Sequence, residues 1–346
     1  MNHLLINLLV SILLIALVGC SQENDIAVEL RYASPYPPAH PFSLADRTWM
    51  NYVTEASQGK LTFKPFWAGA LLTSDMSMLE IRHNIAHIGL ITPIYTKGGV
   101  HTLKTQSGFY GGVQSIEDQV RVYDCLESRF PQFHHELTGL KVLAVQGGNF
   151  PGVVTRHKPI RQLEDFKGLR LRVPTEVVEL LKQLGADPVN MPMGEVYSAL
   201  AKGVIDGVVA PADTIKSLHF SEVAQHFSMV HFSRGAYPAR AMSMATFNQL
   251  PVNLQNIIVD SRGVWENALN QQLLTAQKLG IDFGRDNGMV FHDFPVEEQK
   301  NFDLLYNKVA EQEAEKLQSL GIDGEPIFHA AQAIISAGSP VTCTQG

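Results

Sequence analysis

Arg172 lies at the end of the apolar segment GLRLRVPTE, residues 168–176. Leucine and valine alternate there with Arg170 and Arg172, which is typical of a β-strand that buries one face. Pro174 ends the strand because proline cannot donate to a sheet ladder. Open α/β sheets bind ligands just beyond the carboxyl ends of their strands, so Arg172 stands where a ligand would bind.

The element after this strand strengthens that interpretation. A helix opens at Pro174-Thr175, and the free N–H groups of a helix start attract anions. The guanidinium fork of Arg172 can grip both oxygens of a carboxylate in parallel. An ion pair between Arg172 and an Asp or Glu of the same lobe fits the spacing equally well, and both interpretations stay open at this point.

Other residues that could do chemistry form no catalytic signature. The sequence contains no GxSxG, HExxH or P-loop motif, and no GxGxxG follows a strand. His83 and His87 are spaced for one helix face, but the expected helix ends near Asn84 and no third ligand is close in sequence. We therefore expect no metal, no cofactor and no catalytic residue.

The elements that would position Arg172 alternate along the chain. Strand-like segments such as 27–34 and 140–147 are separated by helical patterns of roughly 10–15 residues, which predicts an α/β fold with mainly parallel sheets. From Leu250 a helical run extends to Gly280, long enough to bridge two lobes.

Length and composition agree with a two-lobed globular protein. The 346 residues exceed the usual size of one domain, and 45% hydrophobic against 18% charged residues supplies an ample core. The net charge of −7 argues against a nucleic-acid binder, which would need a basic face.

The first 20 residues resemble a bacterial lipoprotein signal peptide. They contain no Asp, Glu, Lys or Arg, and they end in Leu-Val-Gly-Cys, so Cys20 would be the lipidated first residue of the mature chain. A cleaved secretory signal with an incidental cysteine, or an uncleaved anchor, remains an alternative. Of the other two cysteines, Cys125 lies in an amphipathic helix and Cys343 in a tail, 337–346, that is expected to fray. A disulfide between them is possible but is not expected.

Residues 163–211 carry a resemblance to a known family. The stretch LEDFKGLRLRVPTEVVELLKQLGADPVNMPMGEVYSALAKGVIDGVVAP resembles the solute-binding proteins of tripartite ATP-independent periplasmic (TRAP) transporters, of the dicarboxylate-binding (DctP) type. Segments of the N-terminal half, among them EASQGKLTFKPFWAGAL, are similar to the same family, and the similarity extends over most of residues 28–335.

The resemblance implies the periplasmic-binding-protein fold, with two α/β lobes, a hinge and a long helix that spans both lobes. On that basis we expect residues 26–149 plus 236–280 in lobe I and residues 150–235 plus 281–336 in lobe II. The resemblance implies not an enzyme but a binding protein, which would capture an organic acid and deliver it to the small and large membrane subunits of a TRAP permease. We expect a periplasmic monomer, held to a membrane by a lipid on Cys20.

The resemblance also assigns roles to individual residues. Arg172 matches the carboxylate-binding arginine of the family, and Thr175 and Met193 fall where other members line the pocket. Polar groups common in the family are missing near Gly152 and after Asp206-Gly207, which favours a monocarboxylate with an apolar or aromatic body. The remaining candidate ligand contacts are Tyr36, Trp67, Thr92, Asn149, Phe150, Gly152, Ala210, Asp213, Tyr237 and Arg240.

Several of these candidates have a structural alternative. Tyr36, Trp67 and Phe150 could be ordinary core residues, and Arg240 could belong to an ion pair between the lobes. Two other functions also remain open: a lipoprotein that presents its closed form to a signalling receptor, and an enzyme that uses His87 or Asp213 on a bound acid.

Overall fold

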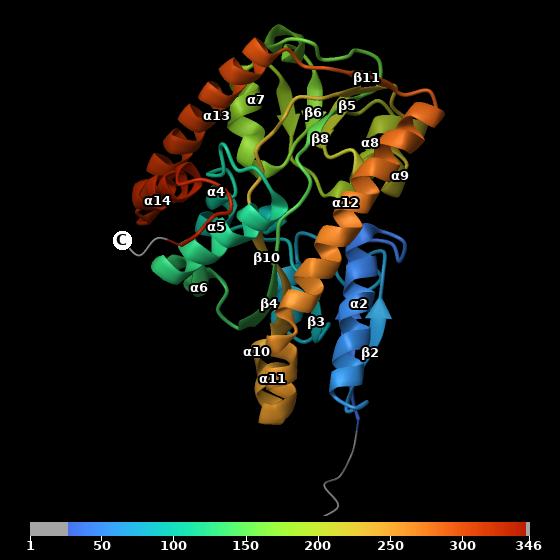
Figure 1. Cartoon of the computed structure of the whole chain (residues 1–346), viewed down its shortest axis with the longest axis vertical. Coiled ribbons are helices and arrows are strands. Elements are labelled where there is room, and N and C mark those ends of the chain that lie inside the picture. The colour runs from blue at the N-terminus through green and yellow to red at the C-terminus, as the bar shows by residue number, and fades with distance from the viewer. Residues whose placement is uncertain (1–26, 344–346) are drawn as a thin grey trace, which may run out of the picture.

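The computed structural model describes residues 27–343, which form two α/β lobes (Figure 1). Each lobe is built on one sheet, and helices cover the sheets. The predicted fold class is therefore confirmed. Residues 1–26 and 344–346, which include Cys20 and the proposed signal peptide, lie outside the described residues.

The sheet of lobe I has the strand order β2-β1-β3-β10-β4. Its first three strands are parallel, and β10 runs antiparallel to β3 and β4. The strand bounds are β1 Val28–Ala33, β2 Leu61–Phe66, β3 Ile88–Leu90, β4 Leu140–Gln146 and β10 Tyr237–Ser243.

The sheet of lobe II has the strand order β11-β9-β5-β8-β6-β7. Strand β6 lies between β7 and β8 and is parallel to both, so its carboxyl end is shared with theirs. The strand bounds are β5 Gly152–Thr155, β6 Arg170–Arg172, β7 Asp187–Val189, β8 Gly207–Ala210, β9 His226–Ser228 and β11 Val290–His292.

Helices and short 3₁₀ turns connect these strands. Those of the first half of the chain are α2 Pro41–Ala56, α3 Ser77–Arg82, η1 Pro93–Tyr95, α4 His101–Gln106, α5 Ile116–Arg129, α6 Gln132–Glu136, η2 Leu163–Phe166 and η3 Thr175–Val177. Those of the second half are α7 Val178–Gln183, α8 Met193–Ala201, α9 Asp213–Ser217, η4 Phe220–Glu222, α10 Met244–Gln249, α11 Val252–Asp260, α12 Arg262–Asp286, α13 Val296–Lys316, η5 Leu317–Leu320 and α14 Glu325–Ser336.

Helix α2 shows how the local sequence sets one of these elements. Pro41 occupies its first turn, where a missing N–H costs nothing, and Nδ1 of His40 accepts a hydrogen bond from the Phe42 amide at 3.2 Å. Trp49 and Val53 lie on the face that packs into the core of lobe I. The helix is therefore started by a histidine cap and held by burial of one face.

The long helix α12 crosses from lobe I to lobe II, as expected (Figure 1). It packs on α2 and β4 in lobe I and on α9 and β11 in lobe II. Gly280 permits the second contact, because a Cβ there would come within 2.1 Å of the Ala212 carbonyl oxygen. The helical run predicted from Leu250 is interrupted at Ser261, which separates α11 from α12.

Helix α14 lies on lobe I, which differs from the prediction. Residues 281–336 were expected in lobe II, but α14 packs against α5 of lobe I. The reason is that Ile327, Phe328 and Ile334 of α14 share one buried cluster with lobe I residues such as Leu126.

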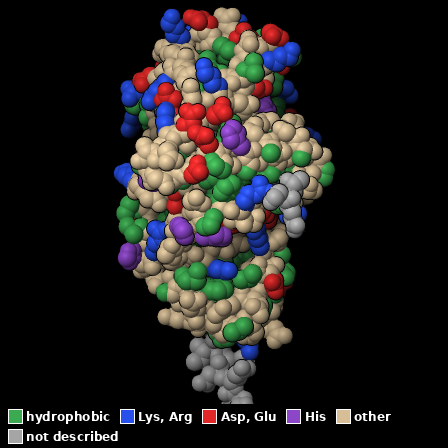
Figure 2. Space-filling view, turned by 90° about the vertical axis from the view of Figure 1, so that its left-hand side faces the viewer, with side chains coloured by type: hydrophobic (Ala, Val, Ile, Leu, Met, Phe, Trp, Pro, Cys, Tyr) green, Lys and Arg blue, Asp and Glu red, His purple; other side chains and the backbone are tan. Residues whose placement is uncertain are grey.

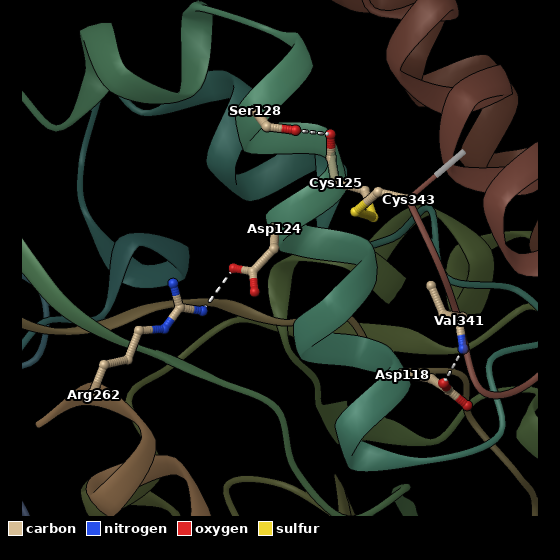
Figure 3. The surroundings of a disulfide bond; sticks show 7 residues. All are labelled: Asp118, Asp124, Cys125, Ser128, Arg262, Val341 and Cys343. Atoms are coloured by element: carbon tan, nitrogen blue, oxygen red, sulfur yellow. Dashed lines mark hydrogen bonds and ion pairs between the residues drawn. A yellow bond between two sulfur atoms is a disulfide. The ribbon is translucent and has the colours of Figure 1, made fainter. Parts of the chain in front are cut away.

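The tail after α14 is attached to α5 rather than frayed. Cys343 forms a disulfide with Cys125, and Oδ1 of Asp118 accepts a hydrogen bond from the Val341 amide at 2.7 Å (Figure 3). Oδ2 of Asp118 accepts from the Ser339 hydroxyl at 2.6 Å. Figure 3 also shows Asp124, one residue before Cys125, directed to Arg262 at the start of α12. The expected frayed tail is therefore corrected for residues 337–343, and the disulfide is present.

Charged side chains of both signs lie on the surface. Acidic and basic side chains are interspersed over the upper part of the face shown in Figure 2. None of the helices within residues 27–343 is long and apolar enough to cross a membrane.

Candidate functional site

Arg172 is the last residue of β6, at the carboxyl edge of the lobe II sheet. Leu171 and Val173 beside it are fully buried in the lobe II core. Arg172 itself is only 2% exposed, although a charged side chain is rarely buried without a partner. Its position therefore matches the prediction, and the nature of its partner decides what it does.

The protein satisfies only part of the hydrogen-bonding capacity of Arg172. Nε donates to the Met191 carbonyl at 3.0 Å, Nη1 donates to the Val209 carbonyl at 3.4 Å, and Nη2 donates to the Tyr95 hydroxyl. A guanidinium has five N–H donors, so one remains on each terminal nitrogen. Among residues 27–343 no carboxylate forms an ion pair with Arg172. The ion-pair alternative is therefore not what the structure contains.

Arg172 borders a cavity between the two lobes. Lobe I contributes Leu90, Thr92 and Tyr95, and lobe II contributes Arg172 and Val209. The cavity has a volume of about 80 Å³, and apolar side chains make up much of its wall. The other lining residues are Tyr36, His40, Phe42, Ile94, Pro151, Pro174, Glu176, Val177, Met193, Pro211, Asp213, Thr214, Leu218, Phe232, Ser233, Arg234, Tyr237 and Leu273.

Four charged side chains line this cavity: Arg172, Arg234, Glu176 and Asp213. None of the four forms an ion pair within the described residues. Arg234 makes one hydrogen bond, from Nη1 to the Asn149 carbonyl at 3.3 Å. The formal charges cancel when both carboxyl groups are ionised, so the empty cavity is close to neutral.

Burial controls the ionisation of the two acids. It raises the pKa of Asp213, although a hydrogen bond from Asn149 at 3.0 Å and the charge of Arg234 oppose that shift. Burial likewise raises the pKa of Glu176, against the charges of Arg234 and Arg172. Both groups therefore take up a proton more readily than an exposed acid would.

Burial keeps two phenols and one imidazole of the cavity neutral. Burial raises the pKa of Tyr36 and of Tyr237, so both phenols keep their protons. Burial and the charge of Arg240 lower the pKa of His40 to about 3. His40 accepts the Phe42 amide hydrogen through Nδ1, so its proton is on Nε2.

Six of the predicted ligand contacts line the cavity together. They are Tyr36, Thr92, Arg172, Met193, Asp213 and Tyr237. Two more lie beside it and join the lobes: Oγ1 of Thr175 donates to the Ile94 carbonyl at 2.8 Å, and Nδ2 of Asn149 donates to Oδ1 of Asp213. Eight of the thirteen expected contacts therefore lie in or beside this cavity.

Four predicted contacts do not line the cavity. Trp67 stacks at a tilt on Tyr32 in the core of lobe I, with 5.6 Å between ring centroids. Phe150 packs against His231, and Ala210 is buried in a lobe II cluster. Gly152 lies in β5, where a Cβ would meet Phe227 at 2.7 Å. These four residues therefore pack inside the lobes, as apolar residues near strand ends often do.

Arg240 does not line the cavity either. Its Nε donates to Oδ1 of Asp46 at 2.6 Å, and its guanidinium lies over the ring of Trp265, 4.4 Å from the centroid. Asp46 is in α2 and Arg240 is in β10, so both residues belong to lobe I. The ion pair therefore does not connect the two lobes, which was the alternative considered from the sequence. Arg240 is corrected to a structural residue because a buried carboxylate already neutralises it.

Sequence reasoning missed Arg234, Glu176, Tyr95 and His40. Arg234 stands only six residues before Arg240, in the same apolar segment SRGAYPAR, and it is Arg234 that lines the cavity. An unexplained charge in that segment was the available signal. Tyr95 gave no signal, because its contact with Arg172 depends on how the two lobes close.

The alternative chemistries find no support in the site. Nδ1 of His87 accepts a hydrogen bond from the Arg31 amide at 3.1 Å, outside the cavity. Within residues 27–343 no three His, Cys, Asp or Glu side chains are grouped to hold a metal. Asp213 is paired with an amide, Asn149, and not with a nucleophile.

Comparison with solved structures identifies the fold. The chain is similar to a TRAP solute-binding protein of Rhodoferax ferrireducens that holds copurified benzoate, with a TM-score of 0.81, 24% identity, and coverage of 90% of this chain and 98% of that chain. It is also similar to a marine metagenome TRAP solute-binding protein described as specific for aromatic acid ligands, in complex with 3-hydroxybenzoate. There the TM-score is 0.78 at 24% identity, with 91% and 99% of the two chains covered.

Curated relatives match over shorter stretches. The sialic acid-binding periplasmic protein of Vibrio cholerae is 43% identical over 79 residues, which is 22% of this chain and 25% of that protein. The matches to the Vibrio cholerae protein and to two further relatives span between 25% and 44% of the lengths of those three proteins.

The sequence model of one family, bacterial extracellular solute-binding protein family 7 (DctP), matches residues 33–316. That match covers most of the chain and both lobes, and the resemblance inferred from residues 163–211 is confirmed. The chain therefore belongs to this family of bacterial extracellular solute-binding proteins.

Proposed function

We propose that this receptor captures a small monocarboxylate with an apolar or aromatic body, and that Arg172 binds the carboxylate. One observation carries the proposal: Arg172 is 2% exposed, has a free N–H on each terminal nitrogen, and has no acidic partner among residues 27–343. Burying an unpaired charge is costly, and a bound carboxylate removes that cost. Thr175 and Asn149 would close the lobes over it.

The balance of charge supports one carboxylate rather than two. Two guanidiniums and two carboxyl groups leave the cavity near neutral, so a monoanion needs only one proton taken up by Glu176 or Asp213 to restore neutrality. A dianion would need two. The raised pKa of each acid makes a single uptake easy.

The walls support an apolar or aromatic body. Phe232, Val209 and Met193 line the cavity along with the rings of several tyrosines. A volume of about 80 Å³ corresponds to about five to eight water-sized groups, which suits a compact acid. The solved relatives that hold benzoate and 3-hydroxybenzoate bind acids of this kind.

Thermal-shift screening of the mature protein tests the proposal. Benzoate, phenylacetate, hexanoate, succinate and glucuronate are compared with benzamide, which keeps the ring and lacks the carboxylate. A ligand present at 100 times its Kd should add about 2.7 kcal/mol of stability. We expect monocarboxylates to give the largest shifts and benzamide none. A benzamide shift equal to that of benzoate would contradict the proposal.

We further propose delivery of the ligand to the two membrane subunits of a TRAP permease. Membership of the family supports this, and closure of the lobes around the ligand would give the permease a shape to recognise. Uptake of labelled ligand into vesicles that contain the permease should require this protein. Uptake that proceeds equally without it would refute delivery.

Anchoring through a lipid on Cys20 is the last part of the proposal. It rests on the sequence Leu-Val-Gly-Cys at residues 17–20. We expect the Cys20→Ala variant to leave the membrane fraction, and the mature wild type to carry a lipid mass at its first residue. Wild type recovered without lipid would refute anchoring.

A further inference from the structure

Gln146 and Tyr237 form a pair at the edge of the cavity between the lobes. Gln146 is the last residue of β4 and Tyr237 is the first residue of β10, and the two lie directly opposite each other in the antiparallel ladder. Residues opposite each other in such a ladder direct their side chains to the same face of the sheet. Tyr237 lines the cavity, whereas Gln146 is completely buried and does not line it. Any effect of Gln146 on a ligand must therefore pass through a neighbour such as Tyr237.

The amide group of Gln146 is held in one orientation. Nε2 of Gln146 donates to the hydroxyl oxygen of Tyr237 at 3.2 Å, and Oε1 accepts from Nη1 of Arg240 at 3.5 Å. A guanidinium can only donate, so the amide oxygen faces Arg240 and the amide nitrogen faces Tyr237. Arg240 is itself fixed by its ion pair with Asp46 at 2.6 Å. The hydroxyl of Tyr237 is therefore the acceptor in its hydrogen bond with Gln146.

The hydrogen of the Tyr237 hydroxyl has no acceptor in the part of the chain that the structure describes. Burial raises the pKa of Tyr237, so the phenol keeps its proton. A phenol has one hydrogen to donate, and no group among residues 27–343 accepts it. The pair of Gln106 and Tyr110 has the opposite polarity, because there the tyrosine hydroxyl donates to Oε1 of the glutamine at 3.0 Å. Tyr237 thus keeps a donor that Tyr110 uses within the protein.

The Tyr237 hydroxyl lies on the side of the cavity that Arg172 borders. Tyr95 packs against the apolar cluster that contains Tyr237, and the hydroxyl of Tyr95 accepts from Nη2 of Arg172. Besides burial, the charge of Arg234 lowers the pKa of Tyr237 and that of Glu176 raises it, and both side chains line the same cavity. A carboxylate held by Arg172 would supply the acceptor that the Tyr237 hydroxyl lacks.

We propose that Tyr237 donates a hydrogen bond to the carboxylate of the ligand, and that Gln146 is the positioning residue that keeps this hydroxyl in the donating orientation. The inference rests on the proposed function, since Arg172 must bind the same carboxylate. A neutral donor suits this place, because it adds a hydrogen bond to a charged group without changing the charge balance of the cavity. The polarity of the Gln146 amide thereby makes the site select an oxygen acceptor, so that an acid is preferred to its amide.

Titration calorimetry of the mature protein with benzoate and hexanoate tests the donor, because the carboxylate is the only strong hydrogen-bond acceptor in either probe. Tyr237→Phe removes the hydroxyl alone and should raise Kd about 10- to 100-fold, the range expected for a hydrogen bond to a charged group. Tyr110→Phe is the matched control, because it removes a buried hydroxyl that is bonded to a glutamine outside the cavity. The control should leave Kd unchanged.

A double-mutant cycle tests the positioning role of Gln146. In Gln146→Glu the introduced carboxylate accepts from the Tyr237 hydroxyl, which turns the hydrogen away from the ligand, and it also adds a negative charge near the cavity. Gln146→Glu/Tyr237→Phe keeps that charge but has no hydroxyl to turn. The factor by which Gln146→Glu raises Kd should therefore be about tenfold or more larger in the wild type than in the Tyr237→Phe background. Gln146→Met, which is uncharged, should cause a smaller loss that likewise disappears without the hydroxyl.

The outcomes separate the two proposals. Circular dichroism of each ligand-free variant checks that it folds, and the cycle is completed with Gln146→Met if Gln146→Glu does not fold. If Tyr237→Phe binds benzoate as tightly as the wild type, or if the substitution of Gln146 raises Kd by the same factor with and without the hydroxyl, the inference is wrong. Loss of binding in Arg172→Met would leave the proposed function standing in that case. If neither acid binds the wild type, both proposals fail.

Discussion

The same substitution should destabilise the protein far more at Arg240 than at Arg172. Arg240 is 3% exposed and is paired with Asp46, whose Oδ1 also accepts from Nε1 of Trp265 at 2.8 Å. Burial works to lower the pKa of Arg240, but the Asp46 carboxylate overrides it and raises the pKa. Arg240→Met keeps the length of the side chain and leaves Asp46 as an uncompensated buried charge.

The size of the loss follows from that geometry. Removing one partner of a buried ion pair costs roughly 3–5 kcal/mol, and loss of the cation–π contact with Trp265 adds about 1 kcal/mol. Arg172→Met leaves no carboxylate unpaired. The free energy lost with the hydrogen bonds of Arg172 should nearly cancel the free energy gained by removing a buried charge, so the free energy of unfolding should change by no more than about 2 kcal/mol. Arg240→Met should therefore be the more destabilising change.

Urea denaturation of the ligand-free protein at pH 7, followed by circular dichroism, measures both free energies of unfolding. The double variant Asp46→Asn/Arg240→Met should recover part of the loss, because the unpaired carboxylate is gone. If Arg240→Met costs less than Arg172→Met, the assignment of Arg240 to structure and Arg172 to binding is wrong.

Three further predictions concern pH and the disulfide. The pKa of His40 is about 3 in the folded protein, so as the pH falls below about 6.5 the unfolded chain binds a proton before the folded protein does, and the folded protein loses stability. The stability lost between pH 7 and pH 5 should therefore be about 2 kcal/mol smaller in His40→Asn than in the wild type. Equal losses in the two sets of denaturation curves would contradict this. Because burial raises the pKa of Asp213, its carboxylate should take up a proton as the pH falls and lose the charge that repels the ligand. The Kd of the wild type for benzoate should therefore fall between pH 8 and pH 5, and the Kd of Asp213→Asn should change less. Identical calorimetric pH profiles of the wild type and the variant would refute this. The double variant Cys125→Ser/Cys343→Ser lacks a disulfide that joins residues 218 positions apart. Its free energy of unfolding should be lower by up to about 5 kcal/mol, because the unfolded chain gains conformational entropy. A urea midpoint equal to that of the oxidised wild type would show that the disulfide does not stabilise the fold.

The sequence predicted the lobes, the long helix and the place of Arg172, because these depend on local periodicity and on a proline that ends a strand. It could not assign Arg240 and Arg234, since the choice depends on whether Asp46, far away in the chain, reaches one of them. The docking of α14 and the tail on lobe I likewise depends on contacts with α5 more than 200 residues earlier.

A crystal structure of the mature protein with benzoate or 3-hydroxybenzoate tests the central claim most directly. The account predicts the carboxylate oxygens about 2.7–2.9 Å from the two terminal nitrogens of Arg172, with the ring between the lobes. A carboxylate bound elsewhere, with Arg172 paired to an acid of the protein itself, would contradict it.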